Sequence, residues 1–194
     1  MATADLKREL ILDGALELFA ERTFAGSPVP LIAERAGVGL GTIYRYFDSK
    51  EALVNELYRK WKATMAADVI GERPTDPSIR SEFVALWTGL ARFASAHPLA
   101  FVFLEAQHHD AYLDQQSKQE GLVLEDHALR FIRRAQRANE VRSGPPRVLL
   151  ALAMGSFRGL VRDCTVTAST VSLSCDATWA LLRRDPRGNT AEPL

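Results

Sequence analysis

Residues 27–50 of this chain read SPVPLIAERAGVGLGTIYRYFDSK and are its most informative segment. Ser27 and Pro28 suit a helix start, because a serine hydroxyl accepts a hydrogen bond from a first-turn N–H and proline has no N–H to leave unpaired. Apolar residues then recur at helical spacing, and Gly37 stands where a chain that leaves a helix often needs a positive φ. The stretch therefore predicts a short helix, a tight turn and a second short helix.

The second helix, expected over residues 42–47, has the side chains that a DNA groove requires. Ile43 and Phe47 lie four residues apart and should face the interior. The Thr, Tyr and Arg side chains on the other faces, with Lys50 after them, can donate hydrogen bonds to phosphates or bases. An ordinary pair of antiparallel helices would share this geometry, but a merely solvated face more often carries Glu and Lys. The leading interpretation is a helix-turn-helix that presents its second helix to the major groove.

Residues 33–53, AERAGVGLGTIYRYFDSKEAL, resemble the DNA-binding core of the tetracycline-repressor (TetR) family of bacterial regulators, and KRELILDGALELFAERTFAGSPVPLI extends the likeness upstream. The A-G-V turn, the G-T-I-Y-x-Y-F helix and the S-K-E-A-L start of the next helix coincide with the family pattern, whereas Thr23 and Gly39 depart from it. The resemblance implies an all-α fold. It places an N-terminal three-helix helix-turn-helix DNA-binding domain at residues 1–48 and a larger helical effector-binding and dimerisation domain at 49–194.

The expected DNA contacts divide by role. Arg45 is the best candidate for a direct base contact, to guanine, whereas the apolar Leu40 either contacts a thymine methyl group or reads no base. Lys50 lies at the start of a helix, where main-chain N–H groups can share a phosphate with it. The complete expected set is Ser27, Val29, Leu40, Gly41, Thr42, Tyr44, Arg45, Tyr46 and Lys50.

Composition sets further limits. The chain has 194 residues, a net charge of +0 and 25% charged residues, which is ordinary for a globular protein. The first 50 residues hold more acidic than basic side chains, so affinity for DNA would come from well-placed contacts in a dimer. Cys164 and Cys175 form no metal-binding or disulfide pattern. A polar N-terminus and short apolar runs predict a cytoplasmic protein with no membrane partner.

The rest of the chain shows helical periodicity and no strand pattern. Helices are expected over 5–22, 49–70, 79–96, 97–113, 117–138, 147–163 and 172–184, with a frayed tail from Arg183 onward. Within the last two helices, small or apolar side chains form two stripes that suit close helix packing, either inside one subunit or between two. The family resemblance favours a homodimer in which these helices form a four-helix bundle. The expected interface residues are Ala151, Gly155, Gly159, Cys175, Thr178, Trp179 and Leu182.

The resemblance also implies a small-molecule effector pocket in the helices after the DNA-binding domain. Residues 79–138 are rich in aromatic side chains with a few polar groups, as an apolar ligand site requires, although any single aromatic is more often plain core. Glu105 and His109 lie four residues apart and could share a helix face as metal ligands, but solvated or ligand-facing histidines are favoured over a metal. His108 and His109 cannot easily share one ion, because neighbouring side chains of a helix point about 100° apart. The expected wall residues are Trp87, Phe103, Gln107, His108, Tyr112, His127 and Phe131.

These patterns together predict a ligand-responsive DNA-binding transcriptional regulator. In the family it resembles, the usual role is a repressor that leaves a palindromic operator when a small effector, here an apolar one, binds. The alternative is a helical protein–protein adaptor that uses a stripe of arginines, Arg130, Arg133, Arg134 and Arg137. An enzyme is less favoured, because the sequence lacks a GxSxG elbow, a phosphate-binding glycine loop, a CxxC and an HExxH. No catalytic residue, cofactor or metal is expected.

Overall fold

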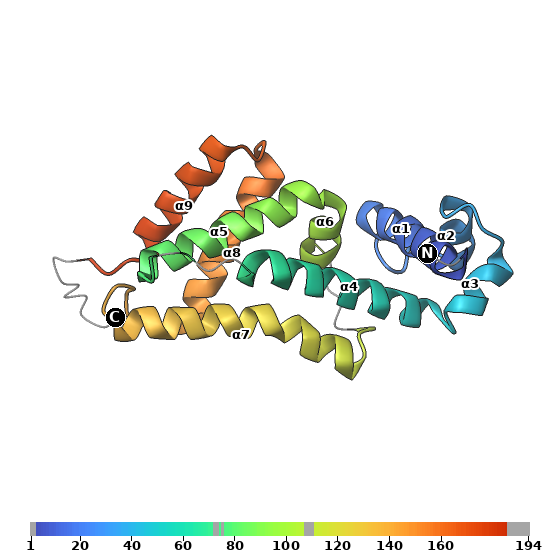
Figure 1. Cartoon of the computed structure of the whole chain (residues 1–194), viewed down its shortest axis with the longest axis horizontal. Coiled ribbons are helices and arrows are strands. Elements are labelled where there is room, and N and C mark those ends of the chain that lie inside the picture. Colours follow the sequence, from blue (N-terminus) through green and yellow to red (C-terminus); the bar gives the residue numbers. More distant parts are fainter. Residues whose placement is uncertain (1–2, 72–73, 75, 107–110, 186–194) are drawn as a thin grey trace. The chain divides into compact units, whose positions relative to one another are not determined.

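The computed structural model describes residues 3–71, 74, 76–106 and 111–185, and these residues fold almost entirely into helices (Figure 1). The helices are α1 (Thr3–Glu21), α2 (Val29–Arg35), α3 (Leu40–Tyr46), α4 (Lys50–Ile70), α5 (Ile79–Ala96), α6 (Pro98–Ala106), α7 (Gln115–Arg137), α8 (Pro146–Asp163) and α9 (Ala168–Leu182). No helix in the described ranges combines the length and the apolar character that crossing a membrane requires.

Most helix bounds agree closely with the sequence pattern, and two differ for identifiable reasons. The α9 helix begins at Ala168, earlier than expected, because Thr167 and Thr170 form a capping box: each hydroxyl accepts a hydrogen bond from the other residue's main-chain N–H, at 3.2 and 2.9 Å. The helix expected over 97–113 is α6 as far as Ala106; residues 107–110 lie outside the described ranges, and residues 111–113 are not helical, with a turn at 111–112, so the expected helix is wrong there.

The fold divides into two compact units. Unit 1 comprises Met1–Ala67 and Ala96–Leu122, and unit 2 comprises Asp68–Ser95 and Val123–Leu194. Both units therefore draw on α4 and α7, whose residues pass from one unit into the other. The division at residues 48 and 49 predicted above is a functional one, and it stays a prediction.

In unit 1, α1 packs against both α2 and α6. The approach of α2 is so close that a Cβ at Gly14 would lie 2.8 Å from the main-chain nitrogen of Ala36, so a side chain cannot fit there. On the other side, the buried ring of Phe103 stacks on Phe19 with centroids 6.0 Å apart. These contacts fix the helices that position the turn between α2 and α3.

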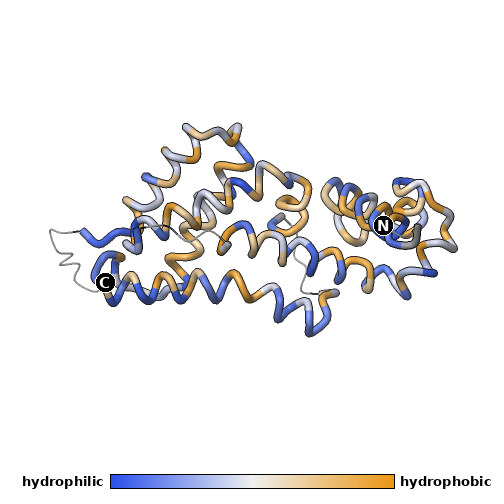
Figure 2. Tube along the Cα trace, viewed as in Figure 1, coloured by the Kyte–Doolittle hydropathy of each residue, from blue (hydrophilic) through white to orange (hydrophobic). Residues whose placement is uncertain are grey.

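Unit 2 is built around an aromatic cluster. Phe83 on α5 stacks on Trp87 and on Phe131 of α7, and it contacts Trp179 of α9 at a centroid distance of 5.2 Å. Trp87 also meets Phe157 of α8 edge-to-face. Hydrophilic and hydrophobic segments alternate along α7, as expected for a helix with one buried face (Figure 2).

The first residues after α9 pair with the α7–α8 connection, so the predicted fraying is wrong for Arg183 and Arg184. Arg183 forms an antiparallel bridge with Val141, and the N–H of Arg184 donates to the carbonyl of Glu140 at 2.8 Å. Val141 is buried and anchors this pairing. The contact joins two loops far apart in the sequence, which no local pattern indicates.

Candidate nucleic-acid interface and effector cavity

The turn between α2 and α3 has the geometry that its sequence predicts. Gly37 has a φ of +64°, which confirms the expected left-handed conformation at the end of α2. The N–H of Val38 donates to the carbonyl of Ala33 at 3.0 Å and closes the turn. Ile43 and Phe47 are only 2% and 3% exposed, so α3 is fixed on the unit by the inward residues expected of it.

The start of α2 differs from the prediction that Ser27 caps the helix. The N-cap residue is Pro28, with no side-chain cap. The Ser27 hydroxyl is buried and donates to the carbonyls of Thr23, at 3.0 Å, and Leu18, at 3.3 Å. The Ser27 side chain thus faces the end of α1 and is closed to solvent, whereas Val29 is half-buried at the first position of α2. The expected DNA contacts of both residues stay predictions.

The outer face of α3 is open. Tyr44 is 53% exposed, Leu40 is exposed, and Thr42 and Tyr46 are half-buried. A Cβ at Gly41 would meet nothing within 4 Å, so packing within the chain does not require a glycine there. The expected DNA contacts of α3 thus lie on one accessible helix.

The ion pairs of unit 1 distinguish the arginine of α2 from the arginine of α3. Arg35, on α2, is bound by Glu17 and Glu21, at 3.2 and 2.9 Å, and its hydrogen bond lowers the pKa of Glu21. Arg45, on α3, has no such partner among the described residues, and its guanidinium is exposed. The arginine that the sequence assigns to base contact is therefore the one left available for it.

Lys50 has a partner within the protein. Its ammonium donates to the carbonyl oxygen of Phe24 and lies 4.0 Å from the centroid of the Phe24 ring, and burial lowers its pKa. The adjacent Ser49 caps α4 by accepting from the N–H of Ala52 at 3.1 Å. The expected phosphate contact of Lys50 remains a prediction, now with an intramolecular contact that competes with it.

A second candidate site lies inside unit 2, where α5, α7 and α8 surround an apolar slot of about 80 Å³. Three predicted wall residues, Trp87, His127 and Phe131, meet there. The complete lining is Val69, Phe83, Leu86, Trp87, Leu90, Leu124, His127, Ala128, Phe131, Ile132, Leu150, Ala153, Met154 and Leu182.

A wider hollow of about 330 Å³ adjoins this slot and shares Val69, Leu86 and His127 with it. Glu82 also borders the hollow. Burial lowers the pKa of His127, and the positive charge of Arg130 lowers it further. His127 thus supplies a neutral polar group at the junction of an apolar slot and a wider opening.

The other predicted wall residues do not join this cavity. Phe103 is buried against Phe19, and Tyr112 stacks on Phe24, both within unit 1. Gln107 and His108, together with the disfavoured metal candidate His109, lie outside the described residues. Among the residues that the structure describes, no group of three or more His, Cys, Asp or Glu could hold a metal ion.

The predicted dimer residues divide between the surface and the interior. Ala151 and Gly155 are exposed on α8 and Gly159 is half-buried. Cys175, Thr178 and Leu182 are buried within unit 2, and Trp179 contacts Phe83 there, so the predicted stripe of α9 is wrong as a surface. The exposed face of α9 carries Leu173, Ala177 and Leu181 instead.

Known families match both parts of the chain. The model of the bacterial regulatory proteins of the tetR family matches residues 11–57, and that of the tetracyclin repressor-like C-terminal domain matches residues 58–180. Among curated relatives, the HTH-type transcriptional repressor KstR2 of Rhodococcus jostii is 45% identical over 53 residues, 27% of this chain and 26% of that protein. The HTH-type transcriptional regulator SrpR of Pseudomonas putida is 23% identical over 196 residues, 96% of this chain and 90% of SrpR.

Solved structures share the fold. A TetR family transcription regulator from Marinobacter aquaeolei has a TM-score of 0.81 at 19% identity, over 93% of this chain and 97% of that one. A putative tetR family transcription regulator from a Shewanella species has a TM-score of 0.76 at 24% identity, over 92% of this chain and 99% of that one. The chain belongs to the TetR family of bacterial regulatory proteins and is a helix-turn-helix DNA-binding transcriptional regulator.

Proposed function

We propose that this regulator represses transcription as a homodimer on a two-fold symmetric operator and is released by an apolar effector bound in unit 2. The names of two relatives support repression, since KstR2 and KstR of Rhodococcus jostii are both transcriptional repressors. One short reading helix per chain, α3, contacts few bases, and a two-fold dimer doubles the site.

Exposed apolar side chains on α8 and α9 support the dimer. Leu173 is 72% exposed, and Val148, Leu152 and Leu181 are also exposed, on helices that carry Ala151 and Gly155. Large apolar groups gathered on a surface mark protein contacts. Sedimentation should show a dimer for the unchanged chain and a monomer for Leu173→Lys, with Leu122→Lys, another exposed leucine, as the matched control. A dimer that Leu173→Lys leaves intact would contradict this interface.

The operator is found by selecting genomic fragments with the purified protein and mapping the protected bases. We expect a palindrome whose half-sites lie about one helical turn, or somewhat more, apart. Protection of a non-palindromic site by a stable monomer would contradict the proposal.

The observation that carries the effector assignment is the apolar slot that ends at His127 and opens into a wider hollow. A chain-like apolar molecule with one neutral hydrogen-bonding group suits this arrangement, because the chain fills the slot and the polar end meets His127. Glu82 borders the hollow but is paired with Arg134, so a carboxylate at the same end would be opposed chiefly by its loss of hydration beside the apolar slot.

The first probes are therefore 1-octanol and octanoate, added to the protein–operator complex in a mobility-shift assay. We expect octanol to release the operator at lower concentration than octanoate. Ala153 lines the slot, so Ala153→Leu should abolish the octanol response, whereas Ala63→Leu, at an exposed alanine of α4, should not. By linkage, saturating operator must weaken octanol binding by the same factor that octanol weakens operator binding. Equal octanol affinity with and without operator would rule out this mechanism.

A further inference from the structure

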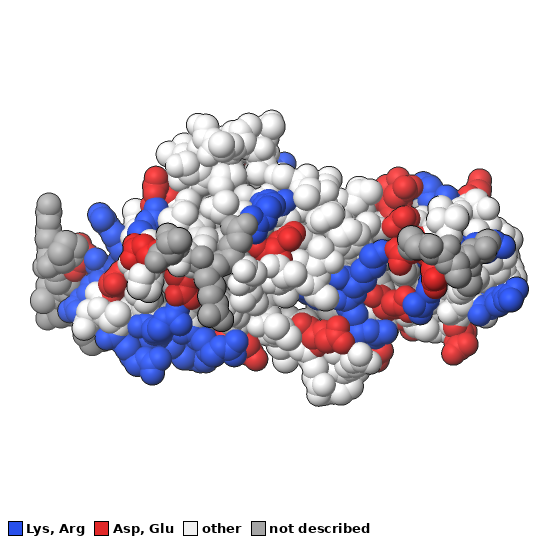
Figure 3. All heavy atoms as spheres, viewed as in Figure 1, with Lys and Arg blue, Asp and Glu red and all other residues white. Residues whose placement is uncertain are grey.

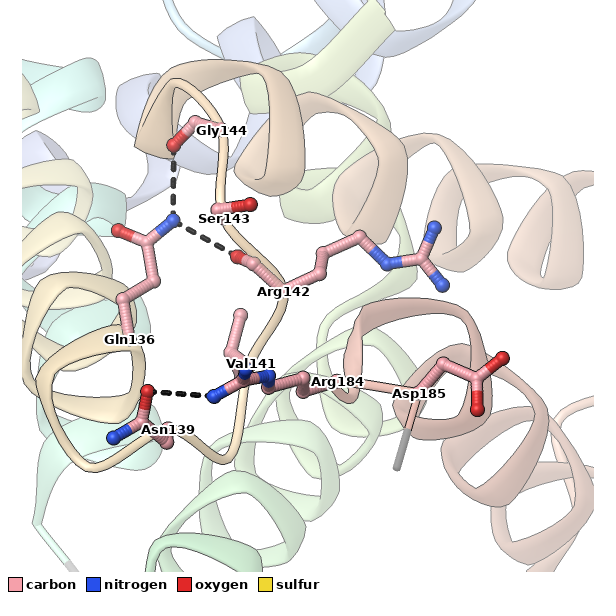
Figure 4. A pocket seen from close by; sticks show the side chains of 8 residues that line it. All are labelled: Gln136, Asn139, Val141, Arg142, Ser143, Gly144, Arg184 and Asp185. Carbon is pink, nitrogen blue, oxygen red and sulfur yellow. Dashed lines mark hydrogen bonds between the residues drawn. The ribbon is translucent and has the colours of Figure 1, made fainter. Parts of the chain in front are cut away.

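A polar hollow of about 670 Å³ lies where the end of α7, the α7–α8 connection and the segment after α9 meet (Figure 4). Small-molecule sites in proteins commonly have volumes of about 300–1,000 Å³. The proposed DNA contacts and the effector cavity use none of its lining residues, which are Gln136, Asn139, Val141, Arg142, Ser143, Gly144, Arg184 and Asp185.

Hydrogen bonds hold the walls of this hollow in place. The main-chain N–H of Arg142 donates to the carbonyl of Leu182 at 3.0 Å, and that of Arg184 donates to Glu140 at 2.8 Å. Asn139, with a φ of +60°, ends α7 and turns the chain into the connection. These hydrogen bonds pair the two loops, so the other donors that line the hollow are held in place before a ligand binds.

Gln136 occupies two main-chain acceptors of the connection. Its side-chain nitrogen donates to the carbonyls of Arg142, at 3.0 Å, and Gly144, at 2.9 Å (Figure 4). In contrast, the N–H groups of Ser143 and Gly144 donate to no other group in the described part of the chain. These two N–H groups are therefore available to bind an anion, while the carbonyls of Val141 and Ser143 also accept no hydrogen bond from the described part of the chain.

The charged side chains of the hollow favour an anion as well. The guanidinium of Arg142 is exposed and forms no ion pair with any described residue. Arg184 donates to the side-chain oxygen of Asn139 at 2.8 Å, a neutral partner that orients the guanidinium without cancelling its charge. Asp185 is the one carboxylate on the lining and opposes an anion.

The surface beside the hollow is strongly basic. Arg130, Arg133 and Arg137 are exposed on the C-terminal half of α7 and form no ion pairs with described residues, whereas Arg134 is bound by Glu82. Figure 3 shows basic side chains gathered over this part of α7. Such a field raises the local concentration of anions.

From these observations we infer that the hollow is a binding site for a small phosphate-bearing anion with at least two negative charges, held by Arg142, Arg184 and the N–H groups of Ser143 and Gly144. Arginine suits this role because its planar guanidinium binds two phosphate oxygens at once. The regulator would thus bind a second ligand, which differs chemically from the apolar effector of the neighbouring cavity.

Inorganic pyrophosphate is the probe, titrated calorimetrically into the full-length protein at an ionic strength held constant with NaCl. We expect saturable binding of one pyrophosphate per chain. Arg142→Gln and Arg184→Gln should each lower the affinity about tenfold, the loss of one charge-assisted contact, and Asp185→Asn should raise it. Arg162→Gln is the matched control, because this exposed arginine pairs with Asp163 elsewhere in unit 2. Thermal unfolding confirms that each variant is folded.

The absence of saturable heat would overturn the inference. So would an equal loss of affinity in Arg133→Gln and Arg142→Gln, since the anion would then bind the basic face of α7 in general. Citrate at the same concentration separates phosphate recognition from charge alone: pyrophosphate should bind more tightly, and equal affinities would contradict a phosphate site.

Discussion

The ring of Tyr112 stacks on the ring of Phe24, with centroids 4.1 Å apart and planes 19° from parallel. Lys50 lies over the same Phe24 ring, and the side-chain nitrogen of Asn55 donates to the carbonyl of Tyr112 at 2.9 Å. Three segments of unit 1 therefore meet at Phe24: the α1–α2 connection, the start of α4 and the residues before α7. Tyr112 supports the unit that carries the reading helix.

This contact changes what substitution of Tyr112 should do. Tyr112→Ala removes the stacked ring and should lower the free energy of unfolding by about 2–4 kcal/mol, at the low end of the range for buried aromatics because the ring is half-buried. Operator affinity should fall with it, whereas Tyr112→Phe should leave both near normal. Urea unfolding and mobility shifts measure the two effects. Normal stability with a selective loss of octanol response would instead place Tyr112 in the effector site.

Arg45 and Arg35 form a matched pair for testing base readout. Arg45→Gln should lose about 1–3 kcal/mol of discrimination at one base pair of each half-site, because its unpaired guanidinium is available to guanine. Arg35→Gln breaks the contacts with Glu17 and Glu21 and should leave base preference unchanged. Competition binding with single-base operator variants measures the base discrimination of each protein. Unchanged discrimination in Arg45→Gln would show that Arg45 contacts phosphates and not a base.

Lys50→Ala separates a phosphate contact from a structural one. If the ammonium binds a phosphate on DNA, the substitution should weaken all sequences similarly and reduce the slope of log affinity against log salt by about 0.9 per contact. If Lys50 contacts only Phe24, the substitution should lower the stability of the protein and leave the salt slope unchanged. The reason is that Lys50 would then release no counterion from DNA. An intact salt slope with a lower unfolding midpoint would show that Lys50 acts only within the protein.

Gly41 and Gly14 should respond to alanine in opposite ways. A Cβ at Gly41 faces open space on α3, so Gly41→Ala should stabilise the protein by up to about 1 kcal/mol through helix propensity. It should also weaken operator binding, since the new methyl group would face the DNA. Gly14→Ala should destabilise the protein, because its Cβ would lie 2.8 Å from the main chain of Ala36. Tighter operator binding by Gly41→Ala would show that DNA does not approach this position.

The turn and most helices could be predicted because their causes are local. The Gly37 turn, the inward Ile43 and Phe47 and the bounds of α5 depend on residues within a few positions of one another. The close approach of Ala36 to Gly14 could not be predicted, because it depends on two helices meeting. The helical repeat of the sequence carries no information about the distance between Gly14 and Ala36.

The candidate sites were less predictable for the same reason. Trp87, His127 and Phe131 have the chemistry of an effector wall and do line one cavity, yet Tyr112 has the same chemistry and packs in the other unit. On α9, Thr178 belongs to an apolar stripe that a helical repeat reveals, but the repeat alone does not say whether that stripe faces the subunit's own core or a partner. The structure places Thr178 in the core.

His127 should make stability depend on pH. Its pKa lies below the ordinary value, because burial and the nearby Arg130 and Arg134 outweigh the opposite effect of Glu82. The folded protein thus binds a proton less readily than the unfolded chain, so the stability that neutral His127 contributes is present above about pH 6.5 and is lost as pH falls through the lowered pKa.

Melting temperatures between pH 8 and pH 5 should fall more steeply for the unchanged protein than for His127→Gln. The octanol response should weaken over the same range, since protonated His127 favours water over an apolar slot. Parallel melting curves for the two proteins would show that His127 is solvated in both states and does not border a dry cavity.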